Sequence, residues 1–213
     1  GFFSGLLILG GLEGSLLLLD VHQVQRNQEY VRMVVLTVVV QALVLGTVVA
    51  LVEELLFRGA LLTALLRGYG RVTAMGLSSV LYAAAHFLKY PEPPPGAELH
   101  WYTGIKLFPP ALRWFGSPGT PEALLSLFLF GMLLALVRLR RDSLWPCIGM
   151  HAGLVTGYKI AGYCTERVPD AEYQFLLSSN SPVLGWLAVL WLGLALFVCH
   201  RFCPVATHDL QGN

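Results

Sequence analysis

Long apolar segments alternate with short polar connections along most of the chain. A helix of about 20 apolar residues crosses the ~30 Å hydrocarbon core of a bilayer, and several segments approach or reach that length. The pattern therefore predicts an all-α, polytopic integral-membrane helical bundle with about six transmembrane helices. The predicted spans are residues 1–19, 43–66, 72–88, 122–139, 144–162 and 183–200.

The apolar segment at residues 31–66 is longer than one membrane crossing requires. As a single helix it would extend about 54 Å, against a hydrocarbon core of ~30 Å. It must therefore tilt, protrude or break. We expect the break at Gly46, with the spanning part running from about Leu43 to Leu66.

The composition also indicates a membrane protein. The 213 residues are 55% hydrophobic and only 13% charged, whereas a soluble domain carries about 25% charged residues. The net charge of +1 gives no indication of a nucleic-acid partner. No polar linker divides the chain, so we expect one membrane-embedded domain over residues 1–213. Within the first apolar segment, Glu13 is expected to make a buried polar contact.

The basic residues predict how the bundle is oriented. Threading the predicted spans through a membrane gathers many arginines on one face, with Asp142 and Asp209 as its acidic residues. Short basic loops are retained in the cytoplasm, so this face should be cytoplasmic. The loop at residues 89–121, rich in proline and aromatic side chains, and the loop at 163–182 should then face outward, the first of them at the membrane surface. The arginines are Arg67, Arg71, Arg138, Arg140, Arg141 and Arg201.

Three ionisable side chains are predicted to meet inside the membrane. Glu53 lies about 21 Å before the basic turn at residues 67–71, and His86 lies about 22 Å after it, at the rise of an α-helix. His151 lies about 14 Å into a later helix that begins on the same face. Helices joined by a short turn are antiparallel neighbours, so these side chains should converge, in the outer half of the membrane.

This set of residues fits the hydrolysis of a peptide bond without a protein nucleophile. Glu54 and Arg58 are four residues apart and can pair on one helix face, while Glu53 points about 100° away, toward the bundle centre. Glu53 and His86 could hold and activate a water molecule. His151 could donate a hydrogen bond to the oxyanion that forms when this water attacks an amide.

The motifs that carry this chemistry are Glu53-Glu54-x-x-x-Arg58-Gly59, then Tyr82-x-x-x-His86, then His151 in a later helix. Their ordered combination resembles the CAAX-protease and bacteriocin-processing family of intramembrane glutamic endopeptidases. The resemblance covers residues 50–157. Outside this core the chain is similar to the family only in being hydrophobic.

The resemblance implies an all-helical integral-membrane protease without metal or another cofactor, and we expect it in a bacterial inner (plasma) membrane. By the same resemblance, Glu53 and His86 activate water, and His151 helps to stabilise the oxyanion. Glu54 and Arg58 form a structural pair. The partners would be membrane lipids and a membrane-tethered protein or peptide, processed at a C-terminal tail or a propeptide and approaching from outside the cytoplasm.

The chain departs from the family pattern at two positions. Tyr82 stands where members usually carry phenylalanine. Val155 stands where members with an HxxxN motif carry an asparagine that serves as a second oxyanion donor. Thr156 or a backbone amide is then the candidate for that donor.

Two other functions fit the same residues. Glu53, His86 and His151 could bind a catalytic zinc ion, since three such ligands plus water form a zinc site, although the chain has no HExxH motif. The chain could also be a non-catalytic membrane scaffold or a transporter, because intramembrane acids mark ion pathways. Against a transporter, we find one carboxylate pair and no matching second half.

Overall fold

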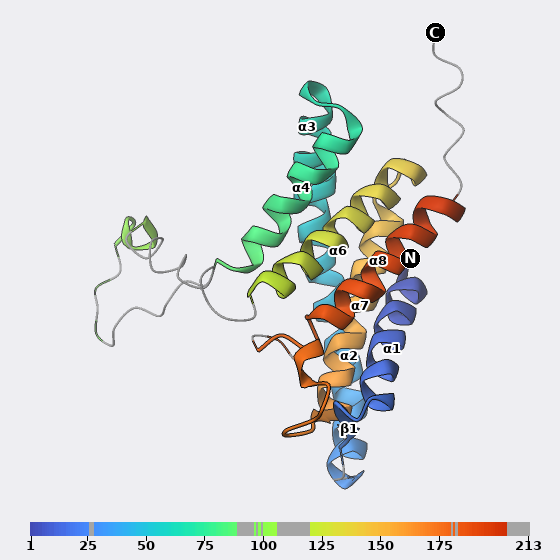
Figure 1. Ribbon diagram of the computed structural model, residues 1–213. Helices are drawn as coiled ribbons and strands as arrows, with labels where there is room; N and C mark the ends of the chain where they lie inside the picture. The colour runs from blue at the N-terminus through green and yellow to red at the C-terminus, as the bar shows by residue number, and fades with distance from the viewer. Residues whose placement is uncertain are drawn as a thin grey trace.

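The computed structural model describes residues 1–25, 28–88, 96, 98, 100–105, 120–179, 181 and 183–203, with the backbone alone for residues 28–36. Helices dominate this part of the chain (Figure 1), which confirms a mainly helical fold. The helices are α1 (Phe2–Leu18), α2 (Gln28–Glu54), the π-helix η1 (Leu55–Leu61), α3 (Leu62–Gly68), α4 (Arg71–His86), α6 (Thr120–Arg141), α7 (Trp145–Cys164), the short 3-10 helix η3 (Gln174–Leu176) and α8 (Trp186–Phe202).

Two helical stretches are long and apolar enough, by length and composition, to cross a membrane. They are Thr37–Gly68, which joins most of α2 to η1 and α3, and Thr120–Arg141, which is α6. The helices Phe2–Leu18 and Trp186–Phe202 are apolar but shorter. The membrane character of the chain is thereby supported within the described residues, and the count of six spans stays a prediction.

Two helices organise the packing of the bundle (Figure 1). Helix α7 packs against α1 and α2, while α6 packs against α4 and α8. The largest apolar core lies where α4, α6, α7 and α8 meet, because each presents buried side chains there. Among its members are Tyr82, Phe130, Leu134, Cys147 and Leu192. This core holds together the helices that carry the candidate histidines.

The predicted break at Gly46 is wrong, because α2 continues through this position as a regular helix. Gly46 is instead a contact point between α2 and α7. A Cβ atom there would lie 2.7 Å from Thr156 Oγ1 and 3.0 Å from the carbonyl oxygen of Ala152. The missing side chain therefore lets the two helix backbones approach each other.

The irregular part of the long helix is η1, at Leu55–Leu61. A π-helical turn is wider than an α-helical one and occurs often at functional sites. Here it follows Glu53 and Glu54 directly and contains Arg58. The hydroxyl of Ser78, on α4, donates a hydrogen bond to the carbonyl of Phe57 at 3.3 Å, which ties α4 to this turn.

The connections that follow α1 and α7 form a small two-stranded sheet that was not predicted from the sequence. Strand β1 (His22–Val24) pairs antiparallel with β2 (Thr165–Arg167). Beside this sheet, Glu13 makes the expected buried contact. Its Oε1 accepts hydrogen bonds from His22 Nδ1 and from Thr165 Oγ1, each at 2.7 Å. The predicted surface loop at residues 89–121 falls largely outside the described residues.

The arginines of the predicted basic face lie near the termini of four helices. These termini lie together at one end of the bundle, the upper end in Figure 1. Helix α3 ends and α4 begins there, and α6 and α8 both end there. We call this the basic end. Its arginines are Arg67, Arg71, Arg138, Arg140, Arg141 and Arg201.

Candidate active site

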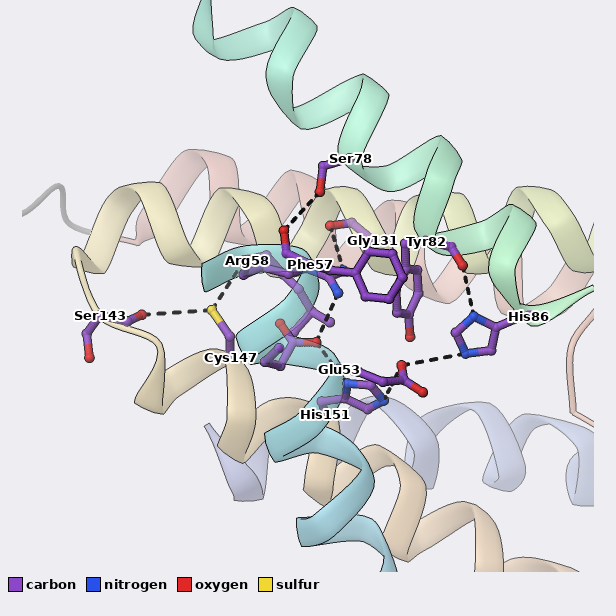
Figure 2. Close-up of polar contacts among 12 residues, drawn as sticks. Glu53, Phe57, Arg58, Ser78, Tyr82, His86, Gly131, Ser143, Cys147 and His151 are labelled. Carbon is purple, nitrogen blue, oxygen red and sulfur yellow. Dashed lines mark hydrogen bonds and ion pairs between the residues drawn. The ribbon is translucent and has the colours of Figure 1, made fainter. Parts of the chain in front are cut away.

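Three helices bring Glu53, His86 and His151 together (Figure 2). Glu53 lies in the last turn of α2, His86 is the last residue of α4, and His151 lies on α7. Glu53 Oε2 is 3.7 Å from His86 Nε2 and 3.9 Å from His151 Nε2. Both separations exceed a direct hydrogen bond, and Glu53 Oε2 has no hydrogen-bond partner in the described part of the chain.

The two imidazoles are each held through Nδ1 and present Nε2 to Glu53. His86 Nδ1 lies 2.9 Å from the carbonyl oxygen of Tyr82. A carbonyl only accepts hydrogen bonds, so Nδ1 carries the proton and Nε2 of the neutral ring is an acceptor. His151 Nδ1 lies 2.9 Å from Glu54 Oε1, so it donates to this carboxylate by the same argument.

The expected ion pair between Glu54 and Arg58 is present. Arg58 Nη1 donates to Glu54 Oε1 at 3.0 Å, and both side chains are buried, with exposed fractions of 1% and 0%. Arg58 Nη2 also donates to the carbonyl of Gly131 at 3.2 Å. The guanidinium carbon lies 4.3 Å from the centre of the Tyr82 ring, within the range of a cation–π interaction.

The contact between Glu54 and His151 was not predicted. The spacing of four residues predicted the pairing of Glu54 with Arg58. Glu54 and His151, by contrast, are 97 residues apart in the chain. No periodicity in the sequence connects such positions. Glu54 thus links the buried arginine to the histidine of α7.

Aromatic rings enclose His151 on two sides, a role that was not predicted from the sequence. The Phe130 ring meets the His151 ring edge-on at 5.3 Å, and Tyr82 approaches it at 6.3 Å. The side chain of His151 is only 3% exposed, while Glu53 and His86 are 26% and 31% exposed. Glu53 and His86 are therefore the more exposed members of the cluster, although the Oε2 atom of Glu53 is itself buried.

A cavity of about 270 Å³ reaches both imidazoles, and we call it the apolar cavity. It is lined mainly by hydrophobic side chains of α1, α6, α7 and α8, including Leu12, Leu127, Leu154, Val155, Trp191 and Leu192. Val155, at the position of the family's asparagine, thus faces this cavity as an apolar residue. The cavity offers space for an apolar group next to the histidines.

Thr156 does not join the cluster, contrary to its expected role as a second donor. Its hydroxyl donates to the carbonyl of Ala42 on α2 at 3.2 Å, and the residue is buried in the contact between α2 and α7. The successive positions Val155 and Thr156 point to different surroundings because residues on a helix are about 100° apart. Thr156 is therefore a helix-packing residue.

Metal binding finds no geometric support in the described ranges. Among these residues, no group of three or more histidine, cysteine, aspartate or glutamate side chains has the arrangement of a metal site.

Comparison with known proteins identifies the family. A model of the family described as "Type II CAAX prenyl endopeptidase Rce1-like" matches residues 35–156, which is more than half of the chain. The matched segment contains Glu53, Glu54, Arg58, His86 and His151. No curated protein and no solved structure matched the chain. The chain belongs to the Rce1-like family of type II CAAX prenyl endopeptidases, a family of membrane proteases.

Proposed function

We propose that this protein is an intramembrane endopeptidase that hydrolyses a peptide bond of a membrane-tethered substrate with a water molecule activated by Glu53 and His86. One observation carries the proposal: the unpartnered Oε2 of Glu53 faces the Nε2 atoms of His86 and His151 at 3.7 and 3.9 Å. These separations suit a single water molecule that bridges the groups.

In the proposed first step, the water oxygen forms a bond to the carbonyl carbon of the substrate while the Glu53 carboxylate takes a water proton. His86 Nε2, which is an acceptor because Nδ1 donates to Tyr82, accepts the other hydrogen bond of this water and orients it. Positioned groups of this kind contribute about 10²–10⁴-fold to a rate.

His151 would stabilise the oxyanion of the tetrahedral intermediate. To donate through Nε2 while Nδ1 donates to Glu54, the ring must be an imidazolium ion. The Glu54 carboxylate, 2.9 Å away, supplies the opposite charge that stabilises this ion. Glu53 then returns its proton to the leaving amine as the carbon–nitrogen bond breaks, and the products are an amine and a carboxylic acid, which ionises by releasing its proton to the solvent.

The apolar cavity supports a lipidated substrate. It touches both histidines and is lined almost entirely by hydrophobic side chains, so it would take up an apolar group near the scissile bond. The family description names prenyl endopeptidases, and a prenyl chain has this chemistry. We accordingly propose a prenylated or similarly lipidated peptide, cleaved near its C-terminal tail.

The proposed orientation places the basic end in the cytoplasm, because short basic loops are retained there. Single cysteines introduced at Arg67 and at Glu172, which lies in the 163–182 loop, would test this in intact membranes, in a chain whose four free cysteines are replaced by serine. Labelling of position 172 from outside and of position 67 only after permeabilisation is expected. The reverse labelling would contradict the orientation.

The central test is Glu53→Gln in the full chain reconstituted into lipid, with prenylated and unprenylated peptides as substrates. Loss of the carboxylate should lower cleavage by about 10³-fold or more, since the amide cannot take the water proton. The matched control is Glu13→Gln, which changes a buried carboxylate that contacts His22, outside the candidate cluster, and should retain cleavage. Thermal unfolding would verify that both variants fold.

Three results would decide against the proposal. Full activity of Glu53→Gln would remove the water-activation mechanism. Loss of activity in chelator, with restoration by zinc, would favour the zinc-dependent protease. A folded wild-type chain that cleaves no lipidated peptide would favour a scaffold.

A further inference from the structure

A second cavity, of about 480 Å³, lies at the basic end of the bundle. Its walls come from η1 and α3, from the start of α4 and from the end of α6, with Arg58, Leu62, Tyr69, Arg71, Arg138 and Asp142 among the lining residues. None of Glu53, His86 and His151 lines it. We call it the arginine cavity, and the proposed protease chemistry does not use it.

The arginine cavity lies where both candidate membrane spans end. One span ends at Gly68 and the other at Arg141, and the cavity is lined by residues close to both ends, such as Leu66, Gly70 and Leu139. Helices that leave the hydrocarbon core at these residues place the cavity at the depth of lipid headgroups. Phosphate is the group that a phospholipid presents at this depth.

The side chains of this cavity are arranged for an anion. Three of them are guanidinium groups, and Asp142 is paired with Arg138 Nη1 at 2.8 Å. The Nε atoms of Arg58 and Arg138 are buried and have no hydrogen-bond partner within the described residues. Both are obligate donors, so an acceptor is the missing partner. A cation would find no free acceptor at these two atoms.

Helix α4 adds further donors at the same place. It begins at Arg71, with Gly70 as N-cap and no side-chain cap, and both residues line the cavity. The first amide N–H groups of a helix lack partners within the helix and carry partial positive charge. Together with the buried Arg58 Nε, they make two independent features that favour an anion.

We propose that the arginine cavity binds a phosphate group, presented by the headgroup of an anionic phospholipid. Guanidinium groups match phosphate oxygens in geometry and charge, and basic pockets between transmembrane helices suit anionic headgroups. The site also touches the proposed active site indirectly, since Arg58 lines the cavity and pairs with Glu54. A bound phosphate would therefore stabilise the arginine that anchors this network.

The test uses the full chain, purified in detergent and stripped of lipid. Its thermal unfolding is followed during titration with short-chain phosphatidylglycerol, with short-chain phosphatidylcholine and with inorganic phosphate. Phosphatidylglycerol should stabilise the wild type at lower concentration than phosphatidylcholine. In Arg71→Gln/Arg138→Gln, the apparent Kd for phosphatidylglycerol should rise about tenfold or more, because two charge-assisted contacts are lost.

The matched control is Arg67→Gln/Arg141→Gln, which removes the same charge from the same end of the bundle at two exposed positions outside the cavity. It should bind phosphatidylglycerol as the wild type does. Equal weakening in both double variants, or no preference of the wild type for phosphatidylglycerol, would overturn the proposal. Stabilisation by inorganic phosphate alone, lost in Arg71→Gln/Arg138→Gln only, would support phosphate binding and assign it to a soluble source.

Discussion

Nδ1 of His151 donates a hydrogen bond to Oε1 of Glu54 at 2.9 Å, and the same oxygen accepts Nη1 of Arg58 at 3.0 Å. One carboxylate oxygen therefore connects a buried cation to the histidine that faces Glu53. The adjacent acids are divided by helix geometry, since neighbouring residues point about 100° apart. The Glu53 side chain is partly exposed, while that of Glu54 is fully buried.

Replacing Glu54 by glutamine should lower kcat with little change in KM. The amide is neutral and cannot stabilise an imidazolium ion at His151. The transition state is then less stabilised, and kcat should fall by about 10²-fold. The measurement is steady-state cleavage by Glu54→Gln, His151→Ala and the double variant. If the fold-changes in kcat of the two single variants multiply in the double variant, Glu54 and His151 act independently, which would contradict a shared role in stabilising the oxyanion.

Removal of the Arg58 side chain should be strongly destabilising. Arg58→Ala leaves the Glu54 charge buried without its partner, which costs about 3–5 kcal/mol. The control is Arg138→Ala, which breaks an ion pair of the same spacing with Asp142, whose side chain is 72% exposed, and should cost less than about 1 kcal/mol. Unfolding in denaturant, followed in the same detergent, compares the two. Similar losses would contradict the importance of the buried pair.

An alanine at position 46 should separate α2 from α7. The added Cβ would meet Thr156 Oγ1 at 2.7 Å and the Ala152 carbonyl at 3.0 Å, and overpacking of this kind costs about 1–3 kcal/mol. Because these helices carry Glu53 and His151, cleavage should fall as well. Gly76→Ala is the control, as its Cβ would contact nothing within 4 Å. Thermal unfolding and cleavage are measured for both variants. Equal changes in Gly46→Ala and Gly76→Ala would contradict the close contact between α2 and α7.

Filling the apolar cavity should discriminate between substrates. Val155→Phe adds a ring next to the histidines and should raise KM for a prenylated peptide by about tenfold or more, with a smaller effect on an unprenylated one. Val52→Phe provides the control, because Val52 is exposed on α2. The comparison of KM for both peptides is the measurement. An equal rise for both peptides would speak against lipid binding in this cavity.

Most helix boundaries could be predicted from the sequence, because uninterrupted apolar segments in a bilayer have few alternatives to a helix. The predicted spans at residues 72–88 and 144–162 correspond to α4 and α7. The break at Gly46 was wrong for a physical reason. A glycine that weakens an isolated helix also permits close packing, and only the neighbouring helix decides between these effects. The sheet of β1 and β2 was missed because each strand is three residues long.

The sequence by itself determined which residues lie at a similar height along neighbouring helices, since helical rise converts residue counts into distances, and it determined that Glu54 and Arg58 share a helix face. Only the tertiary structure decided which side chains touch across helices. The rotation of α7 turns His151 toward Glu53 and Glu54 and turns Thr156 toward Ala42. Helix rotation is set by packing contacts between residues far apart in the chain, and a periodic pattern in one segment carries no information about them.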